Sequence, residues 1–433
     1  MISVFPLAHQ PVNFLILSAG TAGDMHPFLA LACALKKRCH HITFFCPEIH
    51  RHLVELVGID CKPMGNEREY LAILNDPNLW HPRKGIELVL RNTGFAIEEL
   101  LVFFNGIDSS QKQVILAHPL TLAATAVIRH TFPSLHIVAV YLAPSNLRSI
   151  ENPLTFGPLK IPRWMPSIVR KLLWRLIDRY VIDPAALPAV NALRRRYGLQ
   201  GVKHYVDHSQ SVPDLSVTLF PTWFGPTQPD WPRPLHSGYF PVYDPKSSAA
   251  VNPELKEFLA SGSAPLIFTH GTGNRHAAHY FRCALEAAEN LGRRAIFLTA
   301  DRLQLPALLP ADILWQPYVS FSALLPHSVL LIHHGGIGTT AEALKAGTPQ
   351  LVVPLGFDQF DNAARIEYLN AGSSLSYGKV NAKSLTSSLE SMLQPSIYAA
   401  CKNRCRELAE KFSPDKQAED TLCQAIETSI GMK

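Results

Sequence analysis

The residues best suited to chemistry lie where an apolar run meets a helix-forming run. Residues His333–Thr340 of this 433-residue chain read His-His-Gly-Gly-Ile-Gly-Thr-Thr. Glycines let backbone N–H groups approach an anion closely, and the first N–H groups of a helix are unpaired and lie at its positive dipole end. The ring of His334 adds one more donor. We therefore predict a diphosphate-binding turn built from His334, Gly336, Gly338, Thr339 and Thr340.

The same glycines also permit a different prediction. Gly336-x-Gly338-x-x-Ala341 fits the dinucleotide fingerprint, and Asp358 lies 20 residues beyond Gly338, where an acid that binds ribose is expected. The chain would then be an NAD-dependent oxidoreductase. Two features argue against this alternative. Fewer than a hundred residues follow a motif that usually opens its domain, and the paired histidines and the Asp-Gln couple would have no role.

Strands and helices must position these residues. Both halves of the chain alternate strand-like apolar runs with helix-like runs, which indicates parallel sheets covered by helices. In the first half we expect a turn at Gly20–Asp24, a helix at Pro27–Lys37, and strands at Asn13–Ser18, His41–Cys46, Gln113–Leu116 and His136–Tyr141. In the second half we expect helices at His276–Leu291 and Thr339–Ala346, and strands at Pro265–Thr269, Arg294–Leu298, Val329–His333 and Gln350–Pro354.

The predicted fold class is therefore α/β, with two domains. A chain of 433 residues is too long for a single hydrophobic core and suits two domains of about 200 residues each. Periodic structure lapses in the Pro- and Ser-bearing stretch Pro241–Asn252, which is typical of a boundary. We accordingly divide the chain into residues 1–240 and 241–433.

Composition limits the possible partners. Hydrophobic residues make up 47% and charged residues 17% of the chain, so it is globular, and the net charge of +5 is too small for a nucleic-acid-binding surface. The eight cysteines form no C-x-x-C pair, which argues against a zinc or redox site and fits a reducing cytoplasm. No basic residue precedes the short apolar run Phe14–Leu17, and no run of 18 apolar residues occurs. We therefore expect no signal peptide and no membrane span, so any membrane contact would be peripheral.

One segment mixes basic and apolar residues at helical spacing. Lys160–Asp183 contains five arginines and lysines after its first residue, interleaved with Trp164, Trp174 and several leucines and isoleucines. It can be an ordinary surface helix packed on its apolar side. Alternatively, it lies on a membrane or lines a groove for a lipophilic acceptor.

The motifs resemble those of a known family. His334-x-Gly336, followed by Glu342 and then by Asp358-Gln359-x-x-Asn362, resembles the donor signature of glycosyltransferase family 1. Further segments are similar to the rhamnosyltransferases of bacterial rhamnolipid synthesis. These segments are Gly20–Asp24, Asn75–Trp80, Arg170–Arg175, Phe220–Phe224, Asp230–Pro232 and Asp358–Asn362.

This resemblance implies a GT-B fold, which consists of two facing Rossmann-like domains with parallel sheets and an interdomain cleft. Residues 1–240 would bind the acceptor and residues 241–433 the nucleotide sugar, with the last helix, at about 415–430, packing back on the first domain. His334, Gly336, Gly338 and Thr339 would contact the diphosphate, and Gly271 and Thr272 would form a second phosphate-contacting turn. Asp358 and Gln359 would bind sugar hydroxyls, and Trp315 would stack on the pyrimidine.

The resemblance also implies transfer with inversion at the anomeric carbon. The sequence contains no D-x-D triplet, so we expect no metal, with the helix N-terminus at Thr339 and His334 stabilising the leaving diphosphate. By the resemblance Asp24 is the candidate base, since relatives carry an acid or a histidine in this first strand-to-helix turn, and an acid near a helix N-terminus stays ionised. It could instead only cap a helix that begins near Pro27. His26 and His118 are rival bases.

Donor and acceptor stay open at this stage. Glu342 would accept hydrogen bonds from ribose hydroxyls and so favours a UDP-sugar, whereas the overall resemblance favours dTDP-rhamnose. The sugar is the only co-substrate expected, with no further cofactor. By resemblance the acceptor is a hydroxyacyl lipid, whose carboxylate could meet Arg170 or Arg175 while its chain rests on Trp174. The alternatives are another hydrophobic aglycone, or an inactive partner protein that binds a nucleotide sugar without transferring it.

Overall fold

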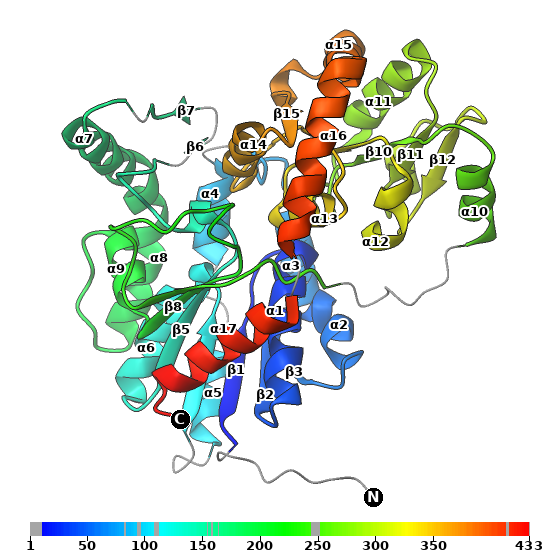
Figure 1. The fold of residues 1–433 in the computed structure, drawn as a ribbon. Helices are drawn as coiled ribbons and strands as arrows, with labels where there is room; N and C mark the ends of the chain where they lie inside the picture. The colour runs from blue at the N-terminus through cyan, green and yellow to red at the C-terminus, as the bar shows by residue number, and fades with distance from the viewer. Residues whose placement is uncertain are drawn as a thin grey trace, which may run out of the picture.

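The computed structural model describes residues 11–81, 84–92, 97–107, 112–153, 155–156, 159–162, 164–243, 252–412 and 415–432. It contains a seven-stranded sheet formed by the first half of the chain and a six-stranded sheet formed by the second half. Figure 1 shows the two sheets in separate lobes, with helices around each. The prediction of an α/β fold with two parallel sheets is confirmed. Residues 244–251, in the stretch predicted as the domain boundary, lie outside the described residues.

The first sheet has the strand order β3-β2-β1-β4-β5-β8-β9, and all of its neighbouring strands are parallel. Its inner strand β1 carries the apolar run Phe14–Leu17, which is completely buried because helices cover both faces of the sheet. The strands are β1 (Asn13–Leu17), β2 (His41–Pro47), β3 (Asp60–Met64), β4 (Gln113–Ala117), β5 (His136–Tyr141), β8 (Leu215–Thr218) and β9 (Leu235–Ser237).

The helices of this lobe follow the strands in the order expected for crossover connections. They are α1 (Ala22–Lys37), α2 (Arg51–Glu55), α3 (Glu67–Asn75), α4 (Lys84–Asn92), α5 (Ile97–Asn105), α6 (Leu122–Thr131), α8 (Asp183–Arg196) and α9 (Tyr205–Ser211). A short hairpin of β6 (Thr155–Phe156) and β7 (Leu159–Lys160) and the helix α7 (Ser167–Ile177) are inserted before α8. In Figure 1 this insertion extends away from the sheet at the outer edge of the molecule.

Helix α1 begins earlier than the sequence predicts. We expected a turn at Gly20–Asp24 and a helix from Pro27, but the helix begins at Ala22 and contains Pro27. A capping box explains the difference, because the Thr21 N–H donates to the Asp24 carboxylate at 2.7 Å. Pro27 is the sixth residue of this helix and has no N–H, so one intrahelical bond is missing in the second turn.

The second sheet has the order β12-β11-β10-β13-β14-β15, also with parallel neighbours. Its strands are β10 (Leu266–Thr269), β11 (Ala295–Leu298), β12 (Ile313–Gln316), β13 (Leu330–His333), β14 (Gln350–Val352) and β15 (Gly372–Ser374). Its helices are α10 (Pro253–Ala260), α11 (Ala278–Asn290), α12 (Phe321–Leu324), α13 (Ile337–Lys345), α14 (Gln359–Tyr368), α15 (Ala382–Leu393) and α16 (Pro395–Ala409). Among the described helices, none combines the length and the apolar character needed to cross a lipid bilayer.

The chain returns to the first lobe at its end. Helix α17 (Asp415–Ser429) contacts α1, β8 and β9, and Figure 1 shows it lying across the first lobe. Just before it, the ring of Phe412 stacks on Phe240 at 5.9 Å and meets Trp223 edge-on at 5.7 Å. These aromatic contacts join the end of the second lobe to the last strand region of the first.

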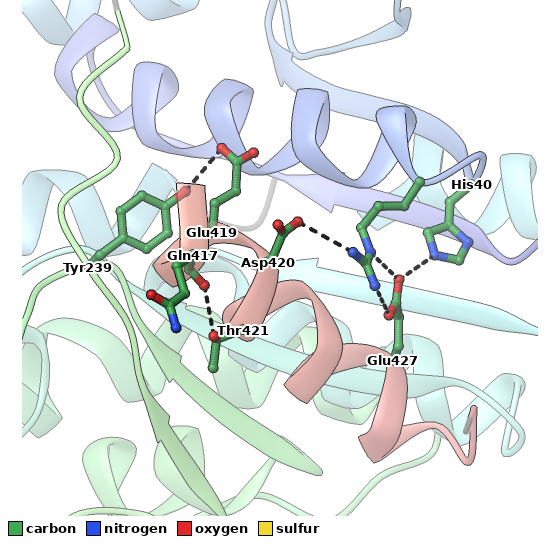
Figure 2. A network of polar contacts seen from close by, with 8 residues as sticks. His40, Tyr239, Gln417, Glu419, Asp420, Thr421 and Glu427 are labelled. Atoms are coloured by element: carbon green, nitrogen blue, oxygen red, sulfur yellow. Dashed lines mark hydrogen bonds and ion pairs between the residues drawn. The ribbon is translucent and has the colours of Figure 1, made fainter. Parts of the chain in front are cut away.

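A buried polar network fixes α17 in place (Figure 2). The Arg38 guanidinium donates to both carboxylate oxygens of Glu427, each at 2.7 Å. His40 Nδ1 accepts the Val12 N–H, so the proton on its Nε2 points to Glu427 at 3.0 Å. The Glu427 carboxylate is only 6% exposed, and its partners hold its pKa below the ordinary value although burial acts against them.

We expect Glu427→Ala to destabilise the protein by about 3 kcal/mol, because breaking a buried pair leaves a charge without its partner. The measurement is the midpoint of thermal unfolding, which should fall by several degrees. Asp420→Ala is the matched control, since Asp420 meets the same guanidinium at 3.5 Å but is half exposed. The control should cost no more than about 0.5 kcal/mol. Equal losses in both variants would contradict the role assigned to Glu427.

Candidate active site

Two glycine turns meet around the ring of His334. Strands β10 and β13 are parallel neighbours, so the turns that follow them lie side by side at the carboxyl edge of the sheet. A Cβ atom at Gly271 would lie 2.6 Å from the His334 ring, and one at Gly336 would also lie 2.6 Å from it. The imidazole therefore fills space that only glycine leaves free. The structure brings the predicted residues Gly271, His334 and Gly336 together.

The neighbouring histidine, His333, holds the turn rather than facing a ligand. Its Nε2 contacts Gln350 Oε1 at 2.9 Å, and its Nδ1 accepts the Gly335 N–H at 3.2 Å. Complete burial lowers its pKa to about 3, so the ring stays neutral. Gly335 has a φ of +92°, in the region that favours glycine. These contacts set the conformation of the turn before α13.

The start of α13 provides donors for an anion. Its N-cap is Gly336, which has no side chain to occupy the first N–H groups, and the first intrahelical bond runs from the Thr340 N–H to the Gly336 carbonyl. The N–H groups at the start of the helix therefore have no intrahelical partner. Within the described residues, His334 Nδ1 is also buried without a partner. Burial lowers the pKa of His334 to about 4, so it would meet an anion as a neutral ring.

The remaining predicted donor-site residues lie at different depths. Thr340 is completely buried, so its side chain points into the packing of α13. Thr339 and Glu342 are half-buried on α13, and Thr272 is exposed immediately after Gly271. Trp315 lies on the edge strand β12, where its indole N–H donates to the Thr299 carbonyl at 2.9 Å.

The Asp-Gln pair lies at the start of the next helix, α14, and its two members behave differently. Gln359 is buried, and its Oε1 accepts the N–H groups of Leu355 and Gly356 at 2.8 and 3.2 Å, so it shapes its own turn. Asn362 Nδ2 donates to Asp358 Oδ2 at 2.8 Å and to the Gly335 carbonyl at 2.9 Å. Asn362 thus fixes the Asp358 carboxylate relative to the glycine turn, a bridging role that the sequence alone did not reveal.

The candidate base Asp24 lies on the facing lobe. It is the third residue of α1, where its Oδ2 accepts from the N–H and hydroxyl of Thr21 at 2.7 and 3.2 Å. The side chain keeps 32% of its exposure, and partial removal from water raises the pKa of Asp24 to about 6. Asp24 therefore both caps the helix and presents a carboxylate that can accept a proton near neutral pH.

The two rival bases lie in less suitable surroundings. His118 is buried, with Nδ1 accepting the Leu120 N–H at 3.3 Å and Nε2 at 3.9 Å from Asp24 Oδ1. Burial lowers the pKa of His118 to about 3, which makes it a poor base. His26 lies two residues after Asp24, on a different side of α1, where its ring meets Tyr243 at 6.3 Å.

The two lobes approach each other closely at this point. A Cβ atom at Gly338 would lie 4.0 Å from the Gly23 carbonyl, so the starts of α13 and α1 face each other. Desolvation, with the negative charge of Asp24 as the second cause, raises the pKa of Asp358 to about 7. The charges of the two carboxylates thus act on each other where the lobes meet, near the glycine turn that precedes α13.

An aromatic residue that the sequence analysis did not propose for the site connects the lobes here. Trp80, in the loop after α3, contacts Phe357 edge-on at 5.7 Å. A Cβ atom at Gly273 would lie 2.9 Å from Thr21 and 3.3 Å from the Trp80 ring, so glycine is required where the lobes touch. Trp80 ends the segment Asn75–Trp80. An aromatic residue at the end of a Pro-Asn turn was the sequence feature that could have identified it as a site residue.

The residues predicted to bind the acceptor are not brought together. Trp174 is buried, with its indole N–H donating to the Ser149 carbonyl at 3.2 Å. Arg170 is also buried and donates to the Glu151 carbonyl at 2.8 Å. Arg175 is exposed on the opposite side of α7. Because the first two side chains attach α7 to the lobe, they offer no open surface to an acceptor. Arg163 of this segment lies outside the described residues.

The position of the glycine motif in the second sheet argues against a dinucleotide-binding site. The motif follows β13, which is the fourth strand of its sheet in chain order rather than the first. A dinucleotide fingerprint follows the first strand of its βαβ unit.

Comparison with known proteins agrees with this arrangement. Residues 285–421 match the family model of the erythromycin biosynthesis protein CIII-like C-terminal domain. The chain is 27% identical to O-mycaminosyltylonolide 6-deoxyallosyltransferase of Streptomyces fradiae, over 95% of this chain and 96% of the relative. It is 25% identical to a sterol 3-beta-glucosyltransferase of Arabidopsis thaliana, over 95% of this chain and 66% of that protein.

Solved structures share the whole fold. The glycotransferase of kitacinnamycin superposes with a TM-score of 0.69 at 17% identity, covering 98% of this chain and 100% of that one. Glycosyltransferase VinC in complex with dTDP superposes with a TM-score of 0.61 at 17% identity, covering 95% and 100%. The fold, the EryCIII-like C-terminal domain and the relatives that match over nearly the whole chain together identify it as a glycosyltransferase of the GT-B fold.

Proposed function

We propose that the protein is an inverting, metal-independent transferase that moves a hexosyl group from a nucleoside diphosphate sugar to a hydroxyl of a lipophilic small molecule. One observation carries the proposal: the start of α1, which bears Asp24, faces the start of α13 where the two lobes meet, and the charge of Asp24 acts on Asp358 of the second lobe. A base and an anion-binding turn on opposite sides of one cleft suit an in-line displacement at a carbon held between them.

The reaction would need one proton transfer and one bond exchange. Asp24 removes the proton of the acceptor hydroxyl, whose oxygen attacks the anomeric carbon from the side opposite the diphosphate. As the new bond forms, the bond from that carbon to the diphosphate oxygen breaks, and the configuration inverts. The N–H groups at the start of α13, with His334, would stabilise the charge on the leaving diphosphate, which is the role a metal ion has in other transferases.

The donor side is assigned to the second lobe. Gly271, Thr272 and Gly336 to Thr339 would surround the diphosphate, and Asp358, held by Asn362, would bind a sugar hydroxyl. The complex of VinC with dTDP and the transfer of a deoxyhexosyl group named for the Streptomyces relative favour a dTDP-deoxyhexose such as dTDP-rhamnose. Glu342, whose carboxylate suits a ribose with both hydroxyls, favours a UDP-sugar instead.

The acceptor is proposed to be lipophilic. The sterol named for the Arabidopsis relative supports this class, and the resemblance to enzymes of rhamnolipid synthesis points to a hydroxyacyl lipid within it. Peripheral contact with a membrane belongs to the same proposal. An inactive nucleotide-sugar-binding protein is the main alternative, and hydrolysis of the donor in the absence of acceptor would argue against it.

We expect dTDP or UDP at about 100 times its Kd to stabilise the protein by about 2.7 kcal/mol. His334→Ala should weaken that nucleotide about 10- to 100-fold, because a hydrogen bond to a charged group contributes about 1.5–3 kcal/mol. Thermal-shift titration measures both effects. His327→Ala, which removes an exposed histidine after α12, is the control and should bind as wild type. Stabilisation by NADH, with none by either nucleotide, would overturn the donor assignment.

We expect Asp24→Asn to lower kcat about 10²- to 10⁴-fold, because the amide cannot take the proton from the acceptor. The amide oxygen can still accept the Thr21 N–H, so nucleotide binding and the thermal midpoint should be kept. His26→Ala serves as the control and should retain activity. If Asp24→Asn remained active and His26→Ala did not, the histidine would be the base.

The pH dependence follows from the same carboxylate. The pKa of Asp24 is raised to about 6, so Asp24 loses its proton, and becomes able to accept another, as the pH rises through 6. We expect kcat/KM of the wild type to fall about tenfold for each pH unit below 6. A profile flat from pH 5 to 8 would show that Asp24 does not act as the base.

A further inference from the structure

The outer face of α7 exposes apolar side chains along one stripe. Ile168, Leu172 and Leu176 follow one another at intervals of four residues on α7. Trp164 lies four residues before them and Tyr180 four residues after them, outside α7, and all five are between 43% and 81% exposed. Of the fourteen large hydrophobic residues exposed in the described part of the chain, six lie between residues 164 and 180. So many exposed apolar side chains on one short segment indicate a contact surface for another protein or for a membrane.

The opposite face of the helix anchors it rigidly. Trp174 and Arg170 are buried and bonded to the carbonyls of Ser149 and Glu151. The Arg148 guanidinium lies 4.9 Å over the Trp174 ring and pairs with the Asp178 carboxylate. The apolar stripe therefore lies on the face of α7 that does not pack on the lobe, and the contacts of the opposite face fix its orientation.

Positive charge accompanies the stripe. Lys171, Arg175 and Arg179 are exposed on the same stretch, and residues 164–177 contain no aspartate or glutamate. The nearest acidic groups are Asp178, which pairs with Arg148, and Glu151, which lies 3.5 Å from Arg170. A helix with Ile and Leu on one face, an exposed Trp just before it, and Lys and Arg beside them matches the interface of an anionic bilayer, where lysine and arginine reach the headgroups.

The insertion also connects this surface to the cleft. In the hairpin before α7, the Thr155 N–H donates to Asp361 Oδ1 at 3.2 Å, and β6 contacts α14. Helix α14 begins next to Asp358, one of the two carboxylates in the cleft. Figure 1 shows α7 beyond this hairpin, at the outer edge of the molecule.

We propose that α7, flanked by Trp164 before it and Tyr180 after it, docks the protein on an anionic lipid surface, from which a lipophilic acceptor reaches the site between the lobes. Docking itself depends only on the surface of α7, whereas the entry of the acceptor rests on the proposed function. A lipid surface fits better than a protein partner, because the contact is a single helix with cations flanking a continuous apolar stripe.

Co-sedimentation with vesicles tests the docking without any measurement of activity. The full chain should bind vesicles of phosphatidylglycerol and phosphatidylcholine, bind pure phosphatidylcholine at least tenfold more weakly, and be released from the anionic vesicles by salt. The double variant Ile168→Asp, Leu172→Asp should lose at least tenfold in binding to anionic vesicles. Lys171→Glu with Arg175→Glu should abolish the preference for anionic lipid.

A matched control separates the stripe from general surface apolarity. Leu303→Asp with Leu308→Asp removes two leucines that are more exposed than those of α7 but lie in the second lobe. This variant should bind vesicles as wild type does. Thermal stabilisation by nucleotide, unchanged in all three variants, would show that they are folded.

The outcomes distinguish the two proposals. Failure of the wild type to bind anionic vesicles, or equal losses in the α7 and control variants, would overturn docking. Self-association lost in the α7 double variant, without vesicle binding, would make the stripe a protein interface instead. Asp358→Asn and His334→Ala test the proposed function through nucleotide binding, and both variants should bind vesicles as wild type does.

Discussion

The site depends on the space around the His334 ring. Two parallel strands end side by side, and the turns after them can approach only because Gly271 and Gly336 carry no Cβ atom that would collide with the imidazole. The ring in turn fills the gap and directs its unpaired Nδ1 and the start of α13 to the same region. Any side chain at either glycine would displace the ring and with it the anion-binding geometry. The pairing of β10 with β13 holds these two turns side by side.

Much of the fold could be predicted from the sequence because buried parallel strands read as short apolar runs. The limits of β5 match the prediction at both ends, and those of β10, β11 and β13 differ by one residue at their starts. The start of α1 differed because a capping box between Thr21 and Asp24 starts the helix at Ala22, five residues before the predicted start at Pro27. Such a cap depends on side-chain geometry that apolar periodicity does not record.

The site was predictable where backbone chemistry dictated residue types, and not where burial decided the role. The glycine turn at His334 was proposed from the demands of an anion, whereas Asp24 and the turn at Gly271 were proposed by resemblance to the family. By contrast, both sides of α7 carry aromatic and basic residues, so the sequence could not tell that Trp174 and Arg170 face inward while Trp164 and Arg175 face solvent. Trp80 was missed for a related reason, because its contacts with Gly273 and Phe357 join segments almost 200 residues or more apart in the chain.

The neutrality of the groups assigned to the diphosphate has a consequence for the base. His334 is kept neutral by burial, and the other donors are backbone N–H groups and hydroxyls. A lysine or arginine in their place would lower the pKa of Asp24 and Asp358 by its positive charge. A weakly basic Asp24 would then accept the acceptor's proton less readily. In the proposed reaction, dipoles that act over a short range would stabilise the leaving diphosphate, while the two partly desolvated carboxylates keep pKa values of about 6 and about 7. Charge stabilisation and proton transfer would then be compatible, because the first relies on dipoles and the second on the full charge of a carboxylate.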